Sequence, residues 1–281
     1  MAANATSLQG HLPSVCRVPV DAHVHFHTRA RVGGTLNAAI SNFATLHHAG
    51  TCNGPGVLLL AQNAGERVFE WLREQAQVGD WSVFPAECES QSLWLRSGRG
   101  QLAVVCGRQV IAEQGLEVLA LGTVGLIEDG LGLERTLAAV HACGALAVLP
   151  WGFGKWRGER AQRIRAQLQS PPIADLWAGD NGGRLQSLAR PPLLAEAEAH
   201  GVGVLPGTDP FPFGNDYRRV GNFGFIVEVT LDPARPWQSV RAALAEQRRS
   251  PPAYGKATGW LGFLFKQAWI QVDKRLRRRS A

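Results

Sequence analysis

The sequence predicts an α/β fold, and the form it favours is a TIM-like barrel of about seven parallel strands. Short apolar runs alternate with segments of helical period, as expected for parallel strands joined by crossover helices. The 281 residues are 45% hydrophobic and 19% charged, so the chain can bury a large core within one domain. The number of alternations favours a closed or nearly closed barrel over an open sheet.

The predicted strands are short apolar runs bounded by turn-forming residues. They cover residues 18–24, 56–61, 81–86, 102–111, 116–121, 145–149, 173–177 and 202–205. About seven of them could be parallel, and residues 89–100 are expected to form a hairpin-like insertion.

The predicted helices carry apolar residues at helical spacing between these strands. They cover residues 35–48, 66–77, 133–142, 159–169 and 192–200. Gly50, Gly79, Gly144 and Gly201 stand near the helix ends, where glycine commonly terminates a helix.

The domain organisation predicted from these patterns has three parts. Residues 1–16 form an N-terminal extension, residues 17–255 the barrel domain, and residues 256–281 an amphipathic helix with a basic tail. Five of the six net positive charges come from lysine and arginine between 274 and 279, which leaves +1 for the rest of the chain. A nearly neutral body argues against a dedicated nucleic-acid-binding protein. The C-terminal helix either packs on the barrel or makes peripheral contact with an anionic membrane surface.

Targeting and redox signals favour a cytoplasmic protein. No apolar run reaches the roughly 18 to 20 residues needed to span a bilayer, and the first residues lack the pattern of a secretory leader. The five cysteines are scattered without metal-binding spacing, so reduced thiols are expected. Peripheral attachment at the inner face of the membrane through the C-terminal helix is the alternative.

The strongest local motif is "VDAHVHFH", from Val20 to His27. Residues two apart on a strand share a face, so Asp21, His23 and His25 are expected to project together where the strand ends. Neutral imidazole nitrogen suits zinc, manganese or iron. The alternative is a polar strand end whose histidines bond to neighbouring groups or to water.

A third ligand is predicted in "GVGVLPGTDPFPF", where an apolar strand runs directly into Asp209. In a barrel, the carboxyl ends of all the strands meet at one rim, so this carboxylate would lie beside His23 and His25. Together these residues would hold one divalent ion. The competing interpretation of Asp209 is an Asx turn before Pro210.

Four segments resemble, in the right order, the metal-binding motifs of the PHP (polymerase and histidinol phosphatase) domain family. They are "VDAHVHFH", "VVCGRQVIAEQGLEVLALG", "GALAVLPWGFG" and "VGVLPGTDPFPF". The resemblance runs from about residue 18 to residue 213. It implies a distorted seven-stranded β/α barrel with up to three metal ions and hydrolysis of phosphate esters. His23 and His25 match the family's HxH pair, and Asp209 matches the acid of its last motif.

Three positions depart from the family pattern. Gln109 stands where the family has a bridging glutamate, Trp151 where it has a histidine, and Phe211 where the last histidine belongs. An indole and a phenyl group coordinate nothing, and an amide is a weak ligand. A single ion is therefore expected in place of a trinuclear cluster. Candidates to replace the missing ligands, each also explicable as structural or solvated, are His27, Glu87, Glu113 and Asp180.

Basic residues in three glycine-containing loops are predicted to bind a small anionic substrate, such as a phosphorylated one. Lys155 and Arg157 lie in the first loop, Arg184 in the second and Arg218 in the third. Lysine offers phosphate a point charge and arginine a bidentate fork. Solvated surface loops are the alternative for each.

The predicted function is that of a metal-dependent phosphoesterase that uses a metal-activated water. Asp209 or Asp21 would accept the proton, and Lys155 would offset the charge that develops. One alternative is a catalytically inactive barrel that binds a ligand or partner. Another is an amidohydrolase-type C–N hydrolase, which shares the first and last motifs. That class usually adds two later histidines, whereas His141 alone stands between His48 and His200, within a predicted helix.

Overall fold

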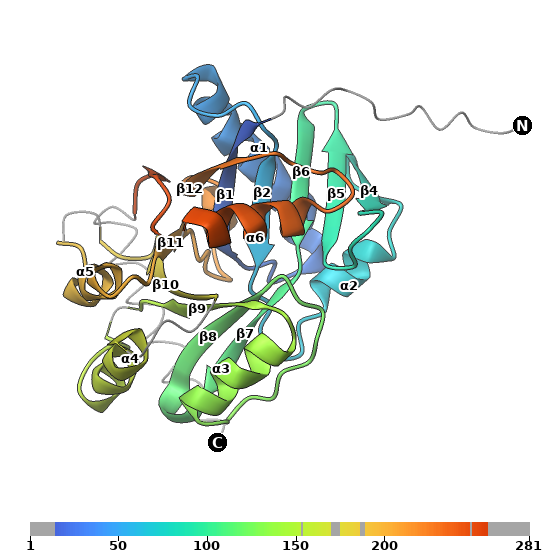
Figure 1. The fold of residues 1–281 in the computed structure, drawn as a ribbon. Coiled ribbons are helices and arrows are strands. Elements are labelled where there is room, and N and C mark those ends of the chain that lie inside the picture. Colours follow the sequence, from blue (N-terminus) through green and yellow to red (C-terminus); the bar gives the residue numbers. More distant parts are fainter. Residues whose placement is uncertain (1–14, 153, 170–174, 186–188, 248, 258–281) are drawn as a thin grey trace, which may run out of the picture.

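The computed structural model describes residues 15–152, 154–169, 175–185, 189–247 and 249–257 (Figure 1). The predicted amphipathic helix and basic tail lie outside the described residues, apart from positions 256 and 257. Most of the predicted N-terminal extension also lies outside them, and Cys16 already belongs to the first strand. None of the helices in the described part of the chain is long and apolar enough to cross a membrane.

An eight-stranded mixed sheet forms the larger half of the molecule. Its strands run in the order β13-β12-β1-β2-β6-β5-β4-β3. Strand β1 pairs in parallel with β2 and antiparallel with β12, and β2 pairs in parallel with β6. The bounds are β1 Cys16–Val24, β2 Gly56–Leu60, β3 Gln77–Val78, β4 Trp81–Pro85, β5 Ser92–Ser97, β6 Gly100–Val105, β12 Phe223–Val229 and β13 Ala253–Gly255.

A five-stranded sheet forms the other half, in the order β11-β10-β9-β8-β7. Strands β9, β10 and β11 are parallel, whereas β7, β8 and β9 pair antiparallel. The bounds are β7 Gly107–Ala112, β8 Leu116–Leu121, β9 Leu146–Pro150, β10 Leu176–Asn181 and β11 Val204–Gly207. The three parallel strands therefore bring their carboxyl ends to one edge of this sheet.

Helices cover the outer faces of both sheets, and one helix lies on the inner side (Figure 1). Helices α1 and α2 pack on the outer face of the eight-stranded sheet, and α3, α4 and α5 pack on the five-stranded sheet. Helix α6 joins the apolar core shared by the two sheets through Trp237, Val240 and Leu244. The bounds are α1 Val32–His48, α2 Val68–Arg73, α3 Leu133–Ala142, α4 Glu159–Gln169, α5 Pro192–Ala199, α6 Pro236–Gln247 and short 3-10 helices η1 Arg29–Arg31, η2 Glu113–Gly115 and η3 Asp216–Arg219.

The predicted TIM-like (β/α)7 barrel is wrong. The described strands form two mixed sheets that are not closed into a barrel. One cause is the run 102–111, which the sequence presents as a single strand. It breaks at Cys106 into β6 and β7, which belong to different sheets. A second cause is the three-residue link η2 between β7 and β8, which is too short for a parallel crossover.

Several antiparallel elements escaped the sequence prediction. Strand β12 runs back beside β1. Helix α6 follows β12, and β13 extends the edge of the sheet beyond it. The prediction placed no strand or helix after residue 205 other than the C-terminal one, so it had no counterpart of β12, α6 or β13. By contrast, the hairpin-like insertion predicted at residues 89–100 contains β5, which pairs antiparallel with β4 and β6.

Candidate metal centre

His23 and His25 lie at the end of β1, beside the end of β11. The backbone N–H of Asp209 donates to the carbonyl of His23 at 2.8 Å, which joins the two strand ends. Gly207 permits this approach, because a Cβ at its position would stand 2.4 Å from the backbone nitrogen of His23. The close contact of β1 and β11 thus brings together ligands that lie far apart in the sequence.

An irregularity in β1 turns the histidines toward the interior. The register of β1 against β2 shifts between Asp21 and Val24. Val20 and Ala22 belong to the core between the sheets, whereas Val24 packs in the cluster on the outer face. Strict alternation would keep these side chains on one face, so the shift, typical of a β-bulge, reverses it. Asp21 therefore does not share a face with His23, contrary to the prediction.

Asp21 anchors the neighbouring strands and does not belong to the ligand cluster. Its Oδ1 accepts the Thr208 backbone N–H at 2.9 Å, and its Oδ2 accepts the Thr208 hydroxyl at 2.6 Å and the Gly221 N–H at 2.9 Å. The side chain is fully buried. Burial raises the pKa of Asp21 to about 6, although the hydrogen bonds from Thr208 and Gly221 act in the opposite direction.

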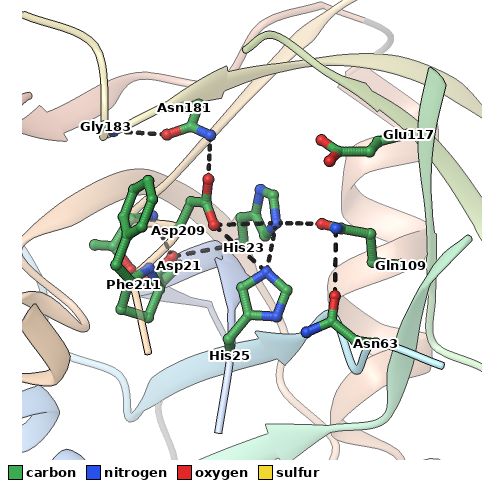
Figure 2. Close-up of polar contacts among 12 residues, drawn as sticks. Asp21, His23, His25, Asn63, Gln109, Glu117, Asn181, Gly183, Asp209 and Phe211 are labelled. Atoms are coloured by element: carbon green, nitrogen blue, oxygen red, sulfur yellow. Dashed lines mark hydrogen bonds and ion pairs between the residues drawn. The ribbon is translucent and has the colours of Figure 1, made fainter. Parts of the chain in front are cut away.

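His23, His25 and Asp209 converge, as the sequence predicted, into a group that could hold a metal ion (Figure 2). The Nε2 atoms of the two histidines lie 3.1 Å apart. Asp209 Oδ1 lies 3.7 Å from His23 Nε2 and 3.4 Å from His25 Nε2. Ligands about 2.0–2.1 Å from one ion at tetrahedral angles stand about 3.3–3.4 Å apart. The donor set therefore fits a single ion.

The electrostatics of the cluster favour the protonation states that bind metal. Burial lowers the pKa of His23 to about 4, so this imidazole is neutral at pH 7 and keeps a free lone pair. Burial alone would raise the pKa of Asp209, but His23, His25 and the amide of Asn181 hold it well below its usual value. Asp209 is therefore ionised.

Asp209 is held in an uncommon conformation by its neighbours. Its φ of 45° lies in the left-handed region, which aspartate tolerates better than most residues do. Asn181, at the end of β10, donates its side-chain amide to Asp209 Oδ2 and accepts the Gly183 N–H at 2.6 Å. This carboxylate is thus aimed at the histidines, and the competing interpretation as a plain turn residue does not explain that orientation.

A second group of potential ligands, His25, His27 and Glu66, has poor geometry for an ion. The rings of His25 and His27 are stacked, with centroids 5.1 Å apart and planes 12° apart. Imidazole lone pairs lie in the ring plane, so two nearly parallel rings cannot both aim at one ion. The planes of His23 and His25 instead differ by 51°.

His27 holds the Asp209 loop in place. Its Nε2 donates to the Pro210 carbonyl at 2.8 Å, and its Nδ1 lies 3.6 Å from Glu66 Oε1. Burial opposes the charge on His27, but the hydrogen bonds with Glu66 and Pro210 raise its pKa overall. We therefore assign His27 a structural role.

Three residues that stand where the PHP motifs would have ligands lie in different surroundings. Gln109, on β7, points its Oε1 at His23 Nε2 across 3.2 Å, and its own amide donates to Asn63. Trp151 lines a cavity beyond the end of β9, and the ring of Phe211 packs against Phe213. Gln109 thus lies in direct contact with a histidine of the cluster.

The predicted anion-binding residues do not form one cluster. Lys155 ion-pairs with Glu117 of β8, whereas Arg157 and Arg184 line the cavity beside Trp151. Arg218 is exposed on η3, with its guanidinium 5.9 Å from the Tyr217 ring. The structure thus places Lys155 and Arg157 in the loop after β9, Arg184 in the loop after β10, and Arg218 elsewhere.

Three polar residues near the site were missed from the sequence. Asn181 holds Asp209, Asn63 accepts from Gln109, and Glu117 faces the cluster from the side of Gln109 (Figure 2). Glu117 carried the clearest signal, because it interrupts the apolar run "LEVLAL" on the same face as Leu119. Asn63 and Asn181 follow apolar runs, where turn chemistry is the ordinary interpretation.

The histidine that an amidohydrolase-type site would need is not near this cluster. His141 lies on α3, where burial lowers its pKa and its charged neighbours are Asp175 and Arg241. His141 therefore does not supply a ligand to this cluster.

Comparisons with known proteins show a fold relationship alone. The crystal structure of PsfC from Pseudomonas syringae PB-5123 aligns with a TM-score of 0.52 at 14% identity, over 94% of this chain and 98% of PsfC. No model of a protein family matches the sequence, and no curated protein matches it.

Proposed function

We propose that the protein is a metal-dependent hydrolase of small phosphate esters, with one zinc, manganese or iron ion on His23, His25 and Asp209. The observation that supports this is the spacing of their donor atoms, 3.1 to 3.7 Å. A bound ion of this kind lowers the pKa of a coordinated water toward neutrality and so supplies a hydroxide nucleophile.

The residues around the ligands have separate roles in this proposal. Asn181 orients Asp209 through its hydrogen bond to Oδ2, so that Oδ1 faces the histidines. The Asp209 carboxylate lies close to the Nε2 atoms of His23 and His25. We assign it the role of accepting the proton of the attacking water. Gln109 contributes a neutral oxygen beside His23. Asp21 supports the site through Thr208 and is not a proton acceptor.

Lys155 is the cation that would offset the negative charge of the phosphoryl group. The positive charge of Lys155 acts on the site, because it helps to lower the pKa of His23. The ion pair with Glu117 fixes the ammonium group beside the start of β8. A cation held in place before the reaction stabilises developing charge without reorganisation.

The test is the metal content of the purified protein. Wild type should bind one ion after supplementation with zinc, manganese or iron, and His25→Ala and Asp209→Ala should each lose it. His48→Ala and Asp80→Ala are matched controls, because both residues are exposed and distant in sequence from the motifs. Phosphatase turnover of the loaded protein is then measured. If wild type bound no ion, there would be no metal-activated water to act as the nucleophile, and the proposal would be wrong.

A second candidate function is ligand binding without catalysis. The observation that favours it is that Trp151 and Phe211 offer no ligand atom, and Gln109 only a neutral oxygen. Stoichiometric metal binding, without turnover in a phosphatase and esterase screen, would favour this candidate over the hydrolase.

A further inference from the structure

A cavity of 170 Å³ lies beyond the carboxyl ends of β9 and β10. Its described walls include Trp151 and Trp156 from the loop after β9, Arg184 from the loop after β10, and Pro191 and Pro192 at the start of α5. Ligands of α/β sheets commonly bind outside the carboxyl ends of parallel strands. Asp209 follows β11, the next strand of this parallel set.

Both loops that build the cavity also reach the metal centre. Lys155 lies between Trp151 and Trp156 in the first loop and bonds to Glu117, which faces the histidines (Figure 2). In the second loop, the Arg184 N–H donates to the carbonyl of Asn181 at 3.1 Å, and Asn181 binds Asp209. A molecule held at the metal centre could therefore extend into the cavity.

The size of the cavity suits one ring. An apolar cavity of about 150 Å³ holds benzene, so 170 Å³ has room for a single six-membered ring. Trp156 is buried at 8% exposure and Trp151 is partly buried. Indole faces stack on planar rings, and the proline rings add a flat apolar wall.

The charge of the cavity favours an anionic substituent on that ring. Arg184 is held by Asp180 through two hydrogen bonds, Nε–Oδ1 at 2.8 Å and Nη2–Oδ2 at 3.2 Å. Asp180 is 6% exposed, so the guanidinium is fixed in place and its charge is balanced. Arg157 brings a positive charge to the wall of the cavity. Arginine is well suited to bind carboxylate or phosphate groups.

We infer that the cavity binds the organic part of the substrate, a single planar ring that carries a second anionic group. The inference rests on the proposed function, because the phosphoryl group of the same molecule would lie at the metal centre. The substrate class is then a phosphate ester of an acidic, single-ring compound.

Calorimetric titration of the metal-loaded protein with stable phosphonates tests whether the cavity prefers a ligand that carries a ring. Phenylphosphonate should bind at least about tenfold more tightly than methylphosphonate, since stacking and burial of one ring are worth that much. Trp151→Ala should remove the preference. Trp71→Ala, a partly buried tryptophan on α2, should keep it. Equal binding of the two compounds by wild type, or an unchanged ratio in Trp151→Ala, would overturn the inference.

A third compound tests the charge. 4-Carboxyphenylphosphonate should bind about fivefold more tightly than phenylphosphonate, and Arg157→Gln should abolish that gain. Arg163→Gln, which removes a charge on α4 outside the cavity, should leave it intact. An equal gain in both variants would reject the role of the Arg157 charge.

His25→Ala separates this inference from the proposed function. It should weaken all three compounds while it preserves their ratios, since the cavity itself is unchanged. Absence of phenyl phosphate turnover in wild type, with the ring preference intact, would reject the hydrolysis and leave the cavity assigned to a ring. Loss of the preference would reject the cavity inference whatever the turnover.

Discussion

Replacement of Asp21 by asparagine should destabilise the protein without removing a catalytic group. The carboxylate accepts backbone N–H groups from Thr208 at Oδ1 and Gly221 at Oδ2. An amide has one oxygen, so whichever way it turns, one of these buried N–H groups loses its acceptor. The Thr208 hydroxyl can adapt by rotating, but a backbone N–H cannot.

The magnitude follows from these contacts. A hydrogen bond to a charged group contributes about 1.5–3 kcal/mol. The neutral amide also removes the cost of burying a charge, which is the main cause of the raised pKa of Asp21. We therefore expect a net loss of about 2 kcal/mol in the free energy of unfolding, smaller than the sum over all of its hydrogen bonds.

Urea denaturation followed by tryptophan fluorescence measures this loss, with Asp80→Asn as a surface control. Thr208→Val completes a double-mutant cycle, in which the coupling to Asp21 should be about 1 kcal/mol. Phosphatase activity of folded Asp21→Asn at saturating metal should remain. If its stability matched that of wild type while activity disappeared, Asp21 would be the proton acceptor and its assignment as an anchor would be refuted.

Three further predictions concern the surroundings of the ligands. Glu66 has its pKa lowered to about 2, because the hydrogen bonds of His27 and Asn63 outweigh burial. A carboxylate with a lowered pKa stabilises the fold above its unfolded pKa and loses this effect as pH falls from 4.5 toward 2. Glu66→Gln should thus remove up to about 3 kcal/mol of unfolding free energy at neutral pH and flatten the acid limb of a stability–pH curve; an unaltered curve would contradict this. Gly207→Ala should abolish metal binding in an equilibrium dialysis assay, because its Cβ would stand 2.4 Å from the His23 nitrogen, whereas Gly98→Ala, with nothing within 4 Å, should be neutral; normal binding by Gly207→Ala would disprove the close approach. Gln109→Glu should raise metal affinity about tenfold in the same assay, because a carboxylate replaces a weak amide ligand, and weaker binding would show that this side chain faces away from the ion.

The candidate metal ligands could be predicted because their signal is local. His23 and His25 follow an apolar strand at strand spacing, and Asp209 follows another. Their convergence could be predicted by assuming that these two strand ends meet, without knowing the whole fold. Gln109 was placed near them by its position in the second motif. Asn63 and Asn181 carry no such local signal, because their role depends on which strands become neighbours.

The barrel was predicted wrongly because strand order and direction depend on long-range pairing. The break at Cys106 separates β6 from β7 without a proline or a polar turn to mark it. Gly107 is the sole local hint, since its Cβ would stand 2.3 Å from the Leu60 carbonyl. Strand β12 had no counterpart in the α/β pattern, although it pairs with β1 from Cys16 to Val20.

Strand β1 can hold both the ligands and their anchor because of its irregularity. Up to Ala22 its alternate residues Val18 and Val20 fill the core between the sheets, while Asp21 on the other face ties β11 and the turn before β12 to the strand. The register shift then directs His23 and His25 inward, toward Asp209 at the end of β11. A regular strand would place Asp21 and the histidines on one face, so that the anchor would compete with the ion for the same space. The bulge places the anchor Asp21 and the histidines on opposite faces of the strand. The site therefore depends on this irregularity as much as on the identity of the histidines.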